Sequence, residues 1–161
     1  ERFSKIGSEP KFENKDVIEE TQKSCDYLQS RFSKQVEFSF NAPKDPIMVL
    51  MNPTLHSWTI ENLVKNAIDA MKGRGKLALQ VIQDGDLVKV NVSDTGNGIP
   101  KSQFKSVFEP GFTTKKRGWG LGLSLTKRIV EEYHKGTIKV LHSEIGKGTT
   151  MQVSFKVTEL I

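Results

Sequence analysis

The sequence predicts an α+β fold in which one sheet and one layer of helices form a two-layer sandwich. Three segments repeat their apolar residues with the period of a helix, so each has one apolar face. Other segments alternate apolar and polar residues, as half-buried strands do. Two glycine-containing turns, Asp84-Gly85 and Gly146-Lys147-Gly148, join such strands into hairpins. Helices and hairpins of this kind bury their apolar faces against one another, which gives two layers.

The N-terminal residues are predicted to lie outside the domain. Residues 1–7 (ERFSKIG) have apolar residues at helical spacing and then a glycine, as at the end of a longer helix. Residues 8–15 are polar and contain Pro10, which indicates a linker. The chain starts without Met or an apolar signal core, so we expect a piece of a longer protein. Residues 16–161 are sufficient for one domain with its own core.

The domain is predicted to begin with a helix and two strands. Asp16 is the expected N-cap of a helix that continues to about Phe32. VEFSF at 36–40 predicts a half-buried strand, and IMVLM at 47–51 predicts a short buried one. The apolar face of the helix consists of Val17, Ile18, Cys25, Leu28 and Phe32.

A second helix and a hairpin follow. Asn52-Pro53 supplies an N-cap and a proline suited to the first helical turn, so we expect a helix over 54–72. GRG at 73–75 ends it, and the segments 77–82 and 87–94 form the first hairpin. The residues expected to be buried on this helix are Trp58, Leu63, Val64, Ala67, Ile68 and Met71.

The rest of the chain predicts a loop, a third helix and a second hairpin. Residues 97–120 are polar and rich in Gly and Lys, and a long polar loop in a compact domain is typical of a functional lid. A helix is expected over 121–134, and the segments 137–143 and 149–157 form the closing hairpin. The expected apolar anchors are Phe104, Val107 and Phe108 in the loop, and Leu125, Ile129, Val130 and Tyr133 on the helix.

The composition excludes several classes of function. With 36% hydrophobic and 27% charged residues, the chain resembles an ordinary globular protein, and it has no apolar run of the roughly 18 residues that a transmembrane helix needs. The single cysteine, Cys25, rules out an internal disulfide and is expected to be a buried thiol. The net charge is +5, the positive residues are scattered, and the one dense cluster, Lys115-Lys116-Arg117, lies beside the glycine-rich turn. The chain has no basic stretch interleaved with aromatic residues, as proteins that bind single-stranded nucleic acid have. Nucleic acid is therefore not an expected partner.

Four segments carry residues suited to chemistry, and the first lies on the second helix. In ENLVKNAIDAM (61–71), Asn62, Asn66 and Asp69 stand at i, i+4 and i+7, so they share one side of the helix. Such a stripe can be ordinary solvated surface. Its amide oxygens can also bind Mg²⁺ when phosphates supply most of the negative charge.

The other three segments contain glycine. DTGNGIP (94–100) can be a simple turn after a strand, or its Asp94 can accept from an exocyclic amine while the glycines leave room for a planar ring. FEPGFTTKKRGWGLGL (108–123) has cations in its middle and ends where backbone N–H groups can meet a phosphate at a helix start. GKGTT (146–150) predicts, on its own, no more than a tight hairpin.

Taken in this order, the segments resemble the N, G1, F, G2 and closing Gly-Thr boxes of the sensor histidine kinases. Asn-x-x-x-Asn-Ala on a helix, Asp-x-Gly-x-Gly-Ile after a strand, a Phe-anchored basic lid, Gly-x-Gly-Leu-Gly-Leu at a helix start and a closing Gly-Thr strand are all present. The resemblance covers about residues 16–157. It implies the Bergerat fold shared with DNA gyrase, Hsp90 and MutL: a mixed sheet of about five strands on three helices, with ATP held under a mobile lid.

The resemblance also implies a role for each matching residue. Asn66 matches the asparagine that coordinates Mg²⁺, Asn62 matches a nearby contact to the phosphates, and Asp69 would lie at the edge of the same pocket. Asp94 matches the carboxylate that binds the adenine amino group, and Thr149 matches the threonine on the adenine side. The base pocket would be shaped by Gly96, Gly98 and Ile99, the lid would contribute Thr113, Thr114 and Lys115, and the phosphate-facing turn would comprise Gly118, Gly120, Leu121, Gly122 and Leu123.

One departure from the superfamily predicts a kinase rather than a hydrolase. The ATP-hydrolysing relatives have a glutamate at the position of Asn62, and an amide cannot accept a proton from water at neutral pH. The adjacent Glu61 is rotated by about 100° around the helix. We therefore expect a domain that holds ATP for a protein nucleophile.

The histidine that would accept the phosphoryl group is not expected in this chain. The family's phosphoacceptor is usually followed by an acidic residue, whereas His56, His134 and His142 are followed by Ser, Lys and Ser. His56 is expected on the helix surface or in a packed turn. The phosphoacceptor would lie on a dimerisation hairpin, and residues 1–7 would be the end of its second helix.

The resemblance implies further partners and leaves alternatives open. The expected partners are the protein's own dimerisation and phosphoacceptor domain and the receiver domain of a response regulator. This fragment would be monomeric and inactive alone, and its parent would be a homodimer. The domain would be cytoplasmic and bacterial, with an inner-membrane anchor of the parent left open. The alternatives are a hydrolysing ATPase of the gyrase or Hsp90 type, a serine kinase like those among the anti-sigma factors, and a degenerate nucleotide-binding module.

Overall fold

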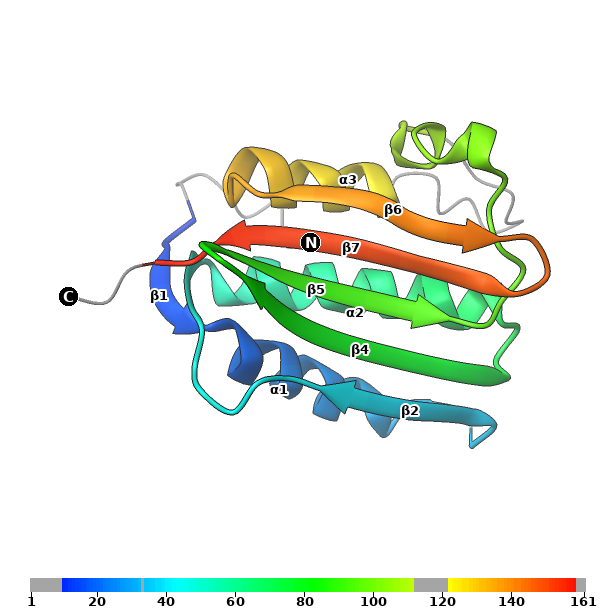
Figure 1. Ribbon diagram of the computed structural model, residues 1–161, viewed down its shortest axis with the longest axis horizontal. Helices are drawn as coiled ribbons and strands as arrows, with labels where there is room; N and C mark the ends of the chain where they lie inside the picture. The colour runs from blue at the N-terminus through cyan, green and yellow to red at the C-terminus, as the bar shows by residue number, and fades with distance from the viewer. Residues whose placement is uncertain (1–9, 33, 112–121, 159–161) are drawn as a thin grey trace.

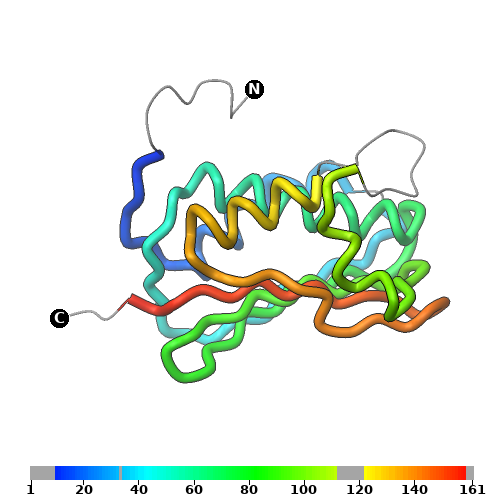
Figure 2. Tube along the Cα trace, turned by 90° about the horizontal axis from the view of Figure 1, so that it is seen from above, coloured from blue at the N-terminus to red at the C-terminus, as the bar shows by residue number. Residues whose placement is uncertain are grey.

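A five-stranded mixed sheet forms one layer of the molecule, and three α-helices cover one face of it (Figure 1). The computed structural model describes residues 10–32, 34–111 and 122–158. The strand order is β2-β4-β5-β7-β6, with β2 and β4 parallel and all other neighbours antiparallel. Seen along the layers, the helices lie together on one side of the strands (Figure 2). The strands are β2 (Val36–Asn41), β4 (Gly75–Asp84), β5 (Leu87–Asp94), β6 (Thr137–Glu144) and β7 (Gly148–Lys156).

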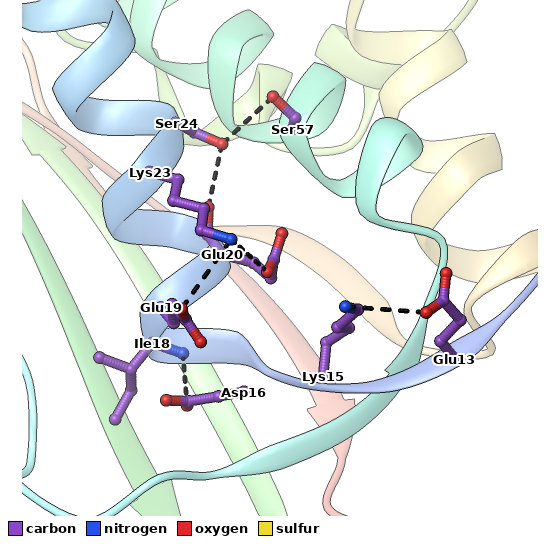
Figure 3. Close-up of polar contacts among 9 residues, drawn as sticks. All are labelled: Glu13, Lys15, Asp16, Ile18, Glu19, Glu20, Lys23, Ser24 and Ser57. Atoms are coloured by element: carbon purple, nitrogen blue, oxygen red, sulfur yellow. Dashed lines mark hydrogen bonds and ion pairs between the residues drawn. The ribbon is translucent and has the colours of Figure 1, made fainter.

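Helix α1 (Val17–Gln29) begins at the predicted cap. The Oδ1 atom of Asp16 accepts a hydrogen bond from the backbone N–H of Ile18 at 3.0 Å (Figure 3). It also accepts from the backbone N–H of Ile47 at 3.1 Å. The first bond satisfies an N–H group that has no partner within the helix. Further along α1, the hydroxyl of Ser24 lies 3.2 Å from that of Ser57, and this contact joins α1 to the next helix (Figure 3).

Helix α2 (Pro53–Ala70) carries the first predicted site residues. Asn52 caps it, because its Oδ1 atom accepts from the backbone N–H of Leu55 at 2.9 Å. The helix ends two residues earlier than predicted, since Lys72 already has a positive φ. The buried face contains Leu63, Val64, Ala67 and Met71 as predicted, whereas Trp58 and Ile68 are only half-buried.

A small second sheet has two strands, which lie on either side of β2 in the sequence. Strand β1 (Glu13–Asp16) pairs antiparallel with β3 (Met48–Met51), so part of the predicted linker 8–15 is in fact paired. The polar composition of 13–15 misled the prediction, because backbone pairing on one edge needs no apolar side chains. The helix end predicted for residues 1–7 lies outside the described residues, and the domain boundary at residue 16 remains a prediction.

Helix α3 (Gly122–Arg128) does not continue as one regular helix over 121–134. A π-helical turn, Ile129–Tyr133, follows it, and the backbone N–H of His134 bonds to the carbonyl of Ile129 at 3.1 Å. The wider turn rotates the last residues relative to a regular helix. Ile129 and Val130 are fully buried as predicted, but Leu125 and Tyr133 are half-buried.

The core lies between the sheet and the helices. Alternate residues of the two central strands point into it, and Cys25 is buried there with 1% of its surface exposed, as predicted. The opposite face of the sheet is polar, and its side chains bond across strands: Gln152 donates to Asn91 at 2.9 Å, and the hydroxyls of Ser93 and Thr150 lie 2.8 Å apart. In the part of the chain that the structure describes, no helix has the length and apolar character needed to cross a membrane.

Candidate functional site

Three of the predicted site residues, Asp94, Gly96 and Thr149, lie at the end of the sheet where β5 finishes and β7 begins. In the antiparallel register, Asp94 at the end of β5 lies directly opposite Thr149 at the start of β7. Helix α2 packs on β5 and on the neighbouring strand β4 (Figure 1). Residues that are 55 positions apart in sequence are therefore neighbours, as the resemblance implied.

Asp94 is a partly buried hydrogen-bond acceptor. Its Oδ1 atom accepts from the backbone N–H of Gly96 at 2.8 Å and of Thr149 at 3.3 Å. Burial raises the pKa of the Asp94 carboxyl above its ordinary value, and these two backbone N–H groups act in the opposite direction. Within the described residues, both bonds end on Oδ1, so Oδ2 has the capacity to accept from a ligand.

The loop after Asp94 is held between α2 and the closing hairpin. The backbone N–H of Asn97 bonds to the carbonyl of Ala70 at 3.1 Å, and Asn97 in turn accepts from the backbone N–H of Gly146 at 2.8 Å. A Cβ atom at Gly96 would lie 2.5 Å from the carbonyl oxygen of Ala70, so this position requires glycine. Gly98 has a φ of +83° and lies against the backbone of the same hairpin. Gly96 and Gly98, which were predicted to shape a base pocket, thus allow the loop after β5, the end of α2 and the closing hairpin to pack closely together.

Asn62 extends from α2 toward the start of α3. The amide nitrogen of Asn62 donates to Thr126 Oγ1 at 2.7 Å, and that hydroxyl donates to the carbonyl of Gly122 at 2.8 Å. A Cβ atom at Gly122 would come within 3.2 Å of the Asn62 amide, so the two helices approach closely here. Sequence reasoning missed Thr126, which is fully buried and joins the two helices. The sequence contained one indication of its role: Thr126 stands four residues after Gly122, so in a helix its hydroxyl can reach the carbonyl of Gly122.

A cavity of about 310 Å³ lies over this part of α2. Asn66 is half-buried and Asp69 is exposed, and both contribute to its wall. Leu123 packs against the core beside it. The lining residues include Leu28, Arg31 and Phe32 from the end of α1 and Asn62, Asn66, Asp69 and Gly122 from the predicted site. In residues 10–32, 34–111 and 122–158 no three His, Cys, Asp or Glu side chains cluster closely enough to hold a metal ion.

Several predicted site residues cannot be placed. The lid residues Thr113, Thr114 and Lys115 and the turn residues Gly118, Gly120 and Leu121 all lie outside the described residues. Phe104 near the start of the predicted loop is half-buried, whereas Val107 and Phe108 are buried as expected.

Two of the three histidines are packed into the fold, and the third is exposed. His56 is buried, with 1% of its surface exposed, which corrects the expected surface or turn position. It faces inward because α2 lies flat on the sheet and positions 56, 60, 63 and 67 share its inner side. His134 is held by Asn52, whose backbone N–H bonds to its Nε2 at 3.2 Å. His142 is exposed on β6.

Comparison with known proteins identifies the family. A family model described as histidine kinase-, DNA gyrase B-, and HSP90-like ATPase matches residues 54–159. The chain belongs to this ATPase family. The match includes α2, the loop after β5 and the closing hairpin, which are the elements that form the site.

Relatives within the ATPase family are sensor histidine kinases. The chain is 37% identical over 118 residues to the sensor histidine kinase ZraS of Escherichia coli strain K12, covering 73% of this chain and 25% of ZraS. It thus spans about a quarter of the length of the curated relatives it matches.

Solved structures of histidine kinases share the fold. The nucleotide-free catalytic domain of the histidine kinase ThkA superposes with a TM-score of 0.81 at 26% identity, covering 93% of this chain and 99% of that domain. A structure of ThkA in complex with the response regulator protein TrrA gives a TM-score of 0.79 at 26% identity, covering 91% of this chain and 42% of ThkA. The five-stranded mixed sheet under three helices, predicted from the resemblance, is confirmed.

Proposed function

We propose that this chain is the catalytic and ATP-binding domain of a sensor histidine kinase, which binds Mg·ATP and transfers its γ-phosphoryl group to a histidine on a separate dimerisation and phosphoacceptor domain. The observation that carries the proposal is the placement of Asp94. A carboxylate that can only accept hydrogen bonds lies at the end of β5, next to glycines whose missing side chains allow three segments to meet. Membership of an ATPase family makes ATP the expected nucleotide.

The base end of the site would be formed by Asp94 and Thr149. The Oδ2 atom of Asp94 would accept from the exocyclic amine of adenine, while Gly96, Gly98 and Ile99 would shape the pocket for the ring. These roles rest on the resemblance together with the observed neighbourhood of Asp94, Thr149 and the loop.

The phosphate end would lie over α2. Asn66 contributes to the wall of the cavity above this helix, and an amide oxygen is a neutral ligand that Mg²⁺ accepts. The described residues hold no cluster of three acidic, His or Cys side chains, so we expect the phosphates to supply most of the ligands of Mg²⁺. When bound, Mg²⁺ neutralises charge on the phosphates.

The geometry around Asn62 favours transfer to a protein over hydrolysis. Asn62 cannot take a proton from water, and its amide nitrogen is engaged with Thr126. The neighbouring Glu61 accepts from Lys65 at 3.1 Å. The position that hydrolysing relatives use for a base therefore carries an amide, and the adjacent carboxylate is paired with Lys65.

The proposal extends to partners that this chain does not contain. The γ-phosphoryl acceptor would be a histidine on the protein's dimerisation and phosphoacceptor domain, and the phosphoryl group would then pass to a response regulator. The parent protein would act as a homodimer, and this domain as a cytoplasmic monomer. The complex of ThkA with a response regulator protein supports the second partner by analogy.

Calorimetric titration with ADP and with a non-hydrolysable ATP analogue tests the nucleotide site. Asp94→Asn keeps the shape of the side chain and its acceptor for Gly96, but removes the charge, so affinity should fall at least about tenfold. Asp86→Asn is the matched control, because Asp86 is exposed in the turn between β4 and β5. Equal affinities of wild type and Asp94→Asn, or no binding by a folded wild type, would overturn the proposed site.

Transfer is tested by mixing this domain with the dimerisation and phosphoacceptor domain of its parent protein and γ-labelled ATP. Label should appear on the partner as an acid-labile phosphohistidine, and Asp94→Asn should abolish it. Release of free phosphate at the same rate with and without the partner would favour a hydrolase instead.

A further inference from the structure

Three side chains form a row across neighbouring strands at the base end of the site. Asp94 on β5 lies opposite Thr149 on β7, and Thr149 lies opposite Ser143 on β6. The three strands are adjacent in the sheet (Figure 1). Ser143 was not among the predicted site residues. Like Asp94, it is a direct cross-strand neighbour of Thr149.

A β-bulge is what brings Ser143 into this row. Val140 pairs with Met151, but His142 pairs with Thr150, so Leu141 is an extra residue in β6. In a regular ladder His142 would lie opposite Thr149, and Ser143 would lie opposite Gly148 with its side chain on the other face of the sheet. The bulge re-aims Ser143 to the face that carries the site.

The hydrogen bonds of Ser143 can be assigned from their partners. The backbone N–H of Ile99 donates to Ser143 Oγ at 2.7 Å, and Ser143 Oγ donates to the carbonyl of Gly148 at 3.1 Å. Because a hydroxyl has one proton, all three contacts are hydrogen bonds at once only when Thr149 donates the third one, at 2.7 Å, to Ser143 Oγ. Each donor and acceptor of the Ser143 hydroxyl is used in this arrangement.

The assignment determines what Thr149 shows to a ligand. In this arrangement the hydroxyl proton of Thr149 is used by the bond to Ser143, so Thr149 Oγ1 offers only lone pairs to a ligand. Asp94 beside it also only accepts. The base end then offers acceptors alone, which suits a ring with an exocyclic amine and opposes one with a carbonyl at that position, since two acceptors facing each other lose a hydrogen bond on each side.

We propose that Ser143 is a positioning residue for base selection. It turns the Thr149 hydroxyl proton away from the site and anchors the backbone of Ile99, so that the pocket selects adenine over a base with a carbonyl in place of the amine. This inference rests on the proposed nucleotide site and deepens it, because it assigns the discrimination to a side chain that does not itself touch the nucleotide.

The test compares binding of ADP with binding of inosine diphosphate, in which a carbonyl replaces the adenine amine. Ser143→Ala frees the Thr149 proton and releases Ile99, so ADP affinity should fall about fivefold to tenfold. The dissociation constant of inosine diphosphate divided by that of ADP measures the selectivity for adenine. This ratio should fall by about threefold or more in Ser143→Ala, because Thr149 can then donate a hydrogen bond to the carbonyl of inosine. Ser143→Thr keeps the hydroxyl and should restore both the affinity and the ratio.

Ser93→Ala is the matched control. This variant removes a contact of similar length, 2.8 Å between the hydroxyls of Ser93 and Thr150, which joins β5 and β7. The contact lies on the face of the sheet opposite the site. Neither the ADP affinity nor the ratio of the two dissociation constants should therefore change. Far-UV circular dichroism and thermal unfolding confirm that each variant is folded. If Ser143→Ala does not fold, Ser143→Cys makes the same comparison with a side chain that is only a weak donor and acceptor.

The outcomes separate the two proposals. If folded wild type binds neither diphosphate, the proposed site is wrong and this inference fails with it. If wild type binds ADP and Ser143→Ala keeps both affinity and ratio, only the role of Ser143 is wrong. A loss of affinity with an unchanged ratio would show that Ser143 merely stabilises the hairpin, and would also overturn the inference.

Discussion

The buried histidine of α2 should make the domain sensitive to acid, and replacing it should remove much of that sensitivity. His56 is fully enclosed, its Nε2 lies 2.9 Å from the hydroxyl of Thr21, and its ring lies edge-on to Phe155 at 5.8 Å between centroids. Burial, and to a smaller extent the nearby His134, lowers the pKa of His56 from 6.5 to about 3. His56 is therefore neutral in the folded protein over most of the acidic range.

The size of the effect follows from proton linkage. Between pH 6.5 and pH 3 the unfolded chain binds a proton at His56 and the folded protein does not, so stability falls as the pH falls through this window. At pH 5 the unfolded histidine is almost fully protonated, and the loss relative to pH 8 is about 2 kcal/mol for this one group. This value is set by the unfolded pKa, because the folded pKa lies well below pH 5.

Urea unfolding at a series of pH values from 8 to 5 measures the effect. The free energy of unfolding of wild type should fall by about 2 kcal/mol more over this range than that of His56→Gln, which keeps a polar group near Thr21 but does not titrate. His142→Gln is the control, because His142 is exposed on β6, and its curve should run parallel to that of wild type. A pH-independent gap between wild type and His56→Gln would refute the reasoning.

Two further predictions concern the site and the core. Asn66→Ala should weaken nucleotide binding in the presence of Mg²⁺ by about tenfold and binding in EDTA much less, because the lost group is a ligand of the ion; equal losses in calorimetric titrations with and without Mg²⁺ would make Asn66 structural. Burial, and to a smaller extent Asp26, raises the pKa of Cys25 to about 12, so the thiol should react with a disulfide reagent only after urea unfolds the domain. Stoichiometric labelling of the native protein within minutes would contradict this burial.

The local features of the fold could be predicted because local interactions decide them. The caps Asp16 and Asn52 bond to backbone groups two and three residues away, and these bonds form in the same way in any fold. The same holds for the two-residue turn between β4 and β5, where Gly85 has a φ of +64°. The polar segment at 13–15 was missed because its pairing partner, β3, is more than thirty residues away.

The amino-acid sequence by itself predicted the order along the chain of the three helices and of the five strands of the large sheet, together with the candidate site residues on them. Asn62, Asn66, Asp94 and Thr149 were recognisable because their types and spacings repeat a known pattern on elements that the apolar periodicity also predicts.

Only the tertiary structure decided which side chains support those residues. Ser143 reaches Thr149 through a one-residue bulge, and a shift of one residue reverses the face of every side chain in a strand. Thr126 reaches Asn62 only because α2 and α3 approach closely beside Gly122. His56 becomes a buried neutral base because α2 lies on the sheet with that side inward. Register, helix contact and burial all depend on residues far apart in sequence, so short-range patterns cannot determine them.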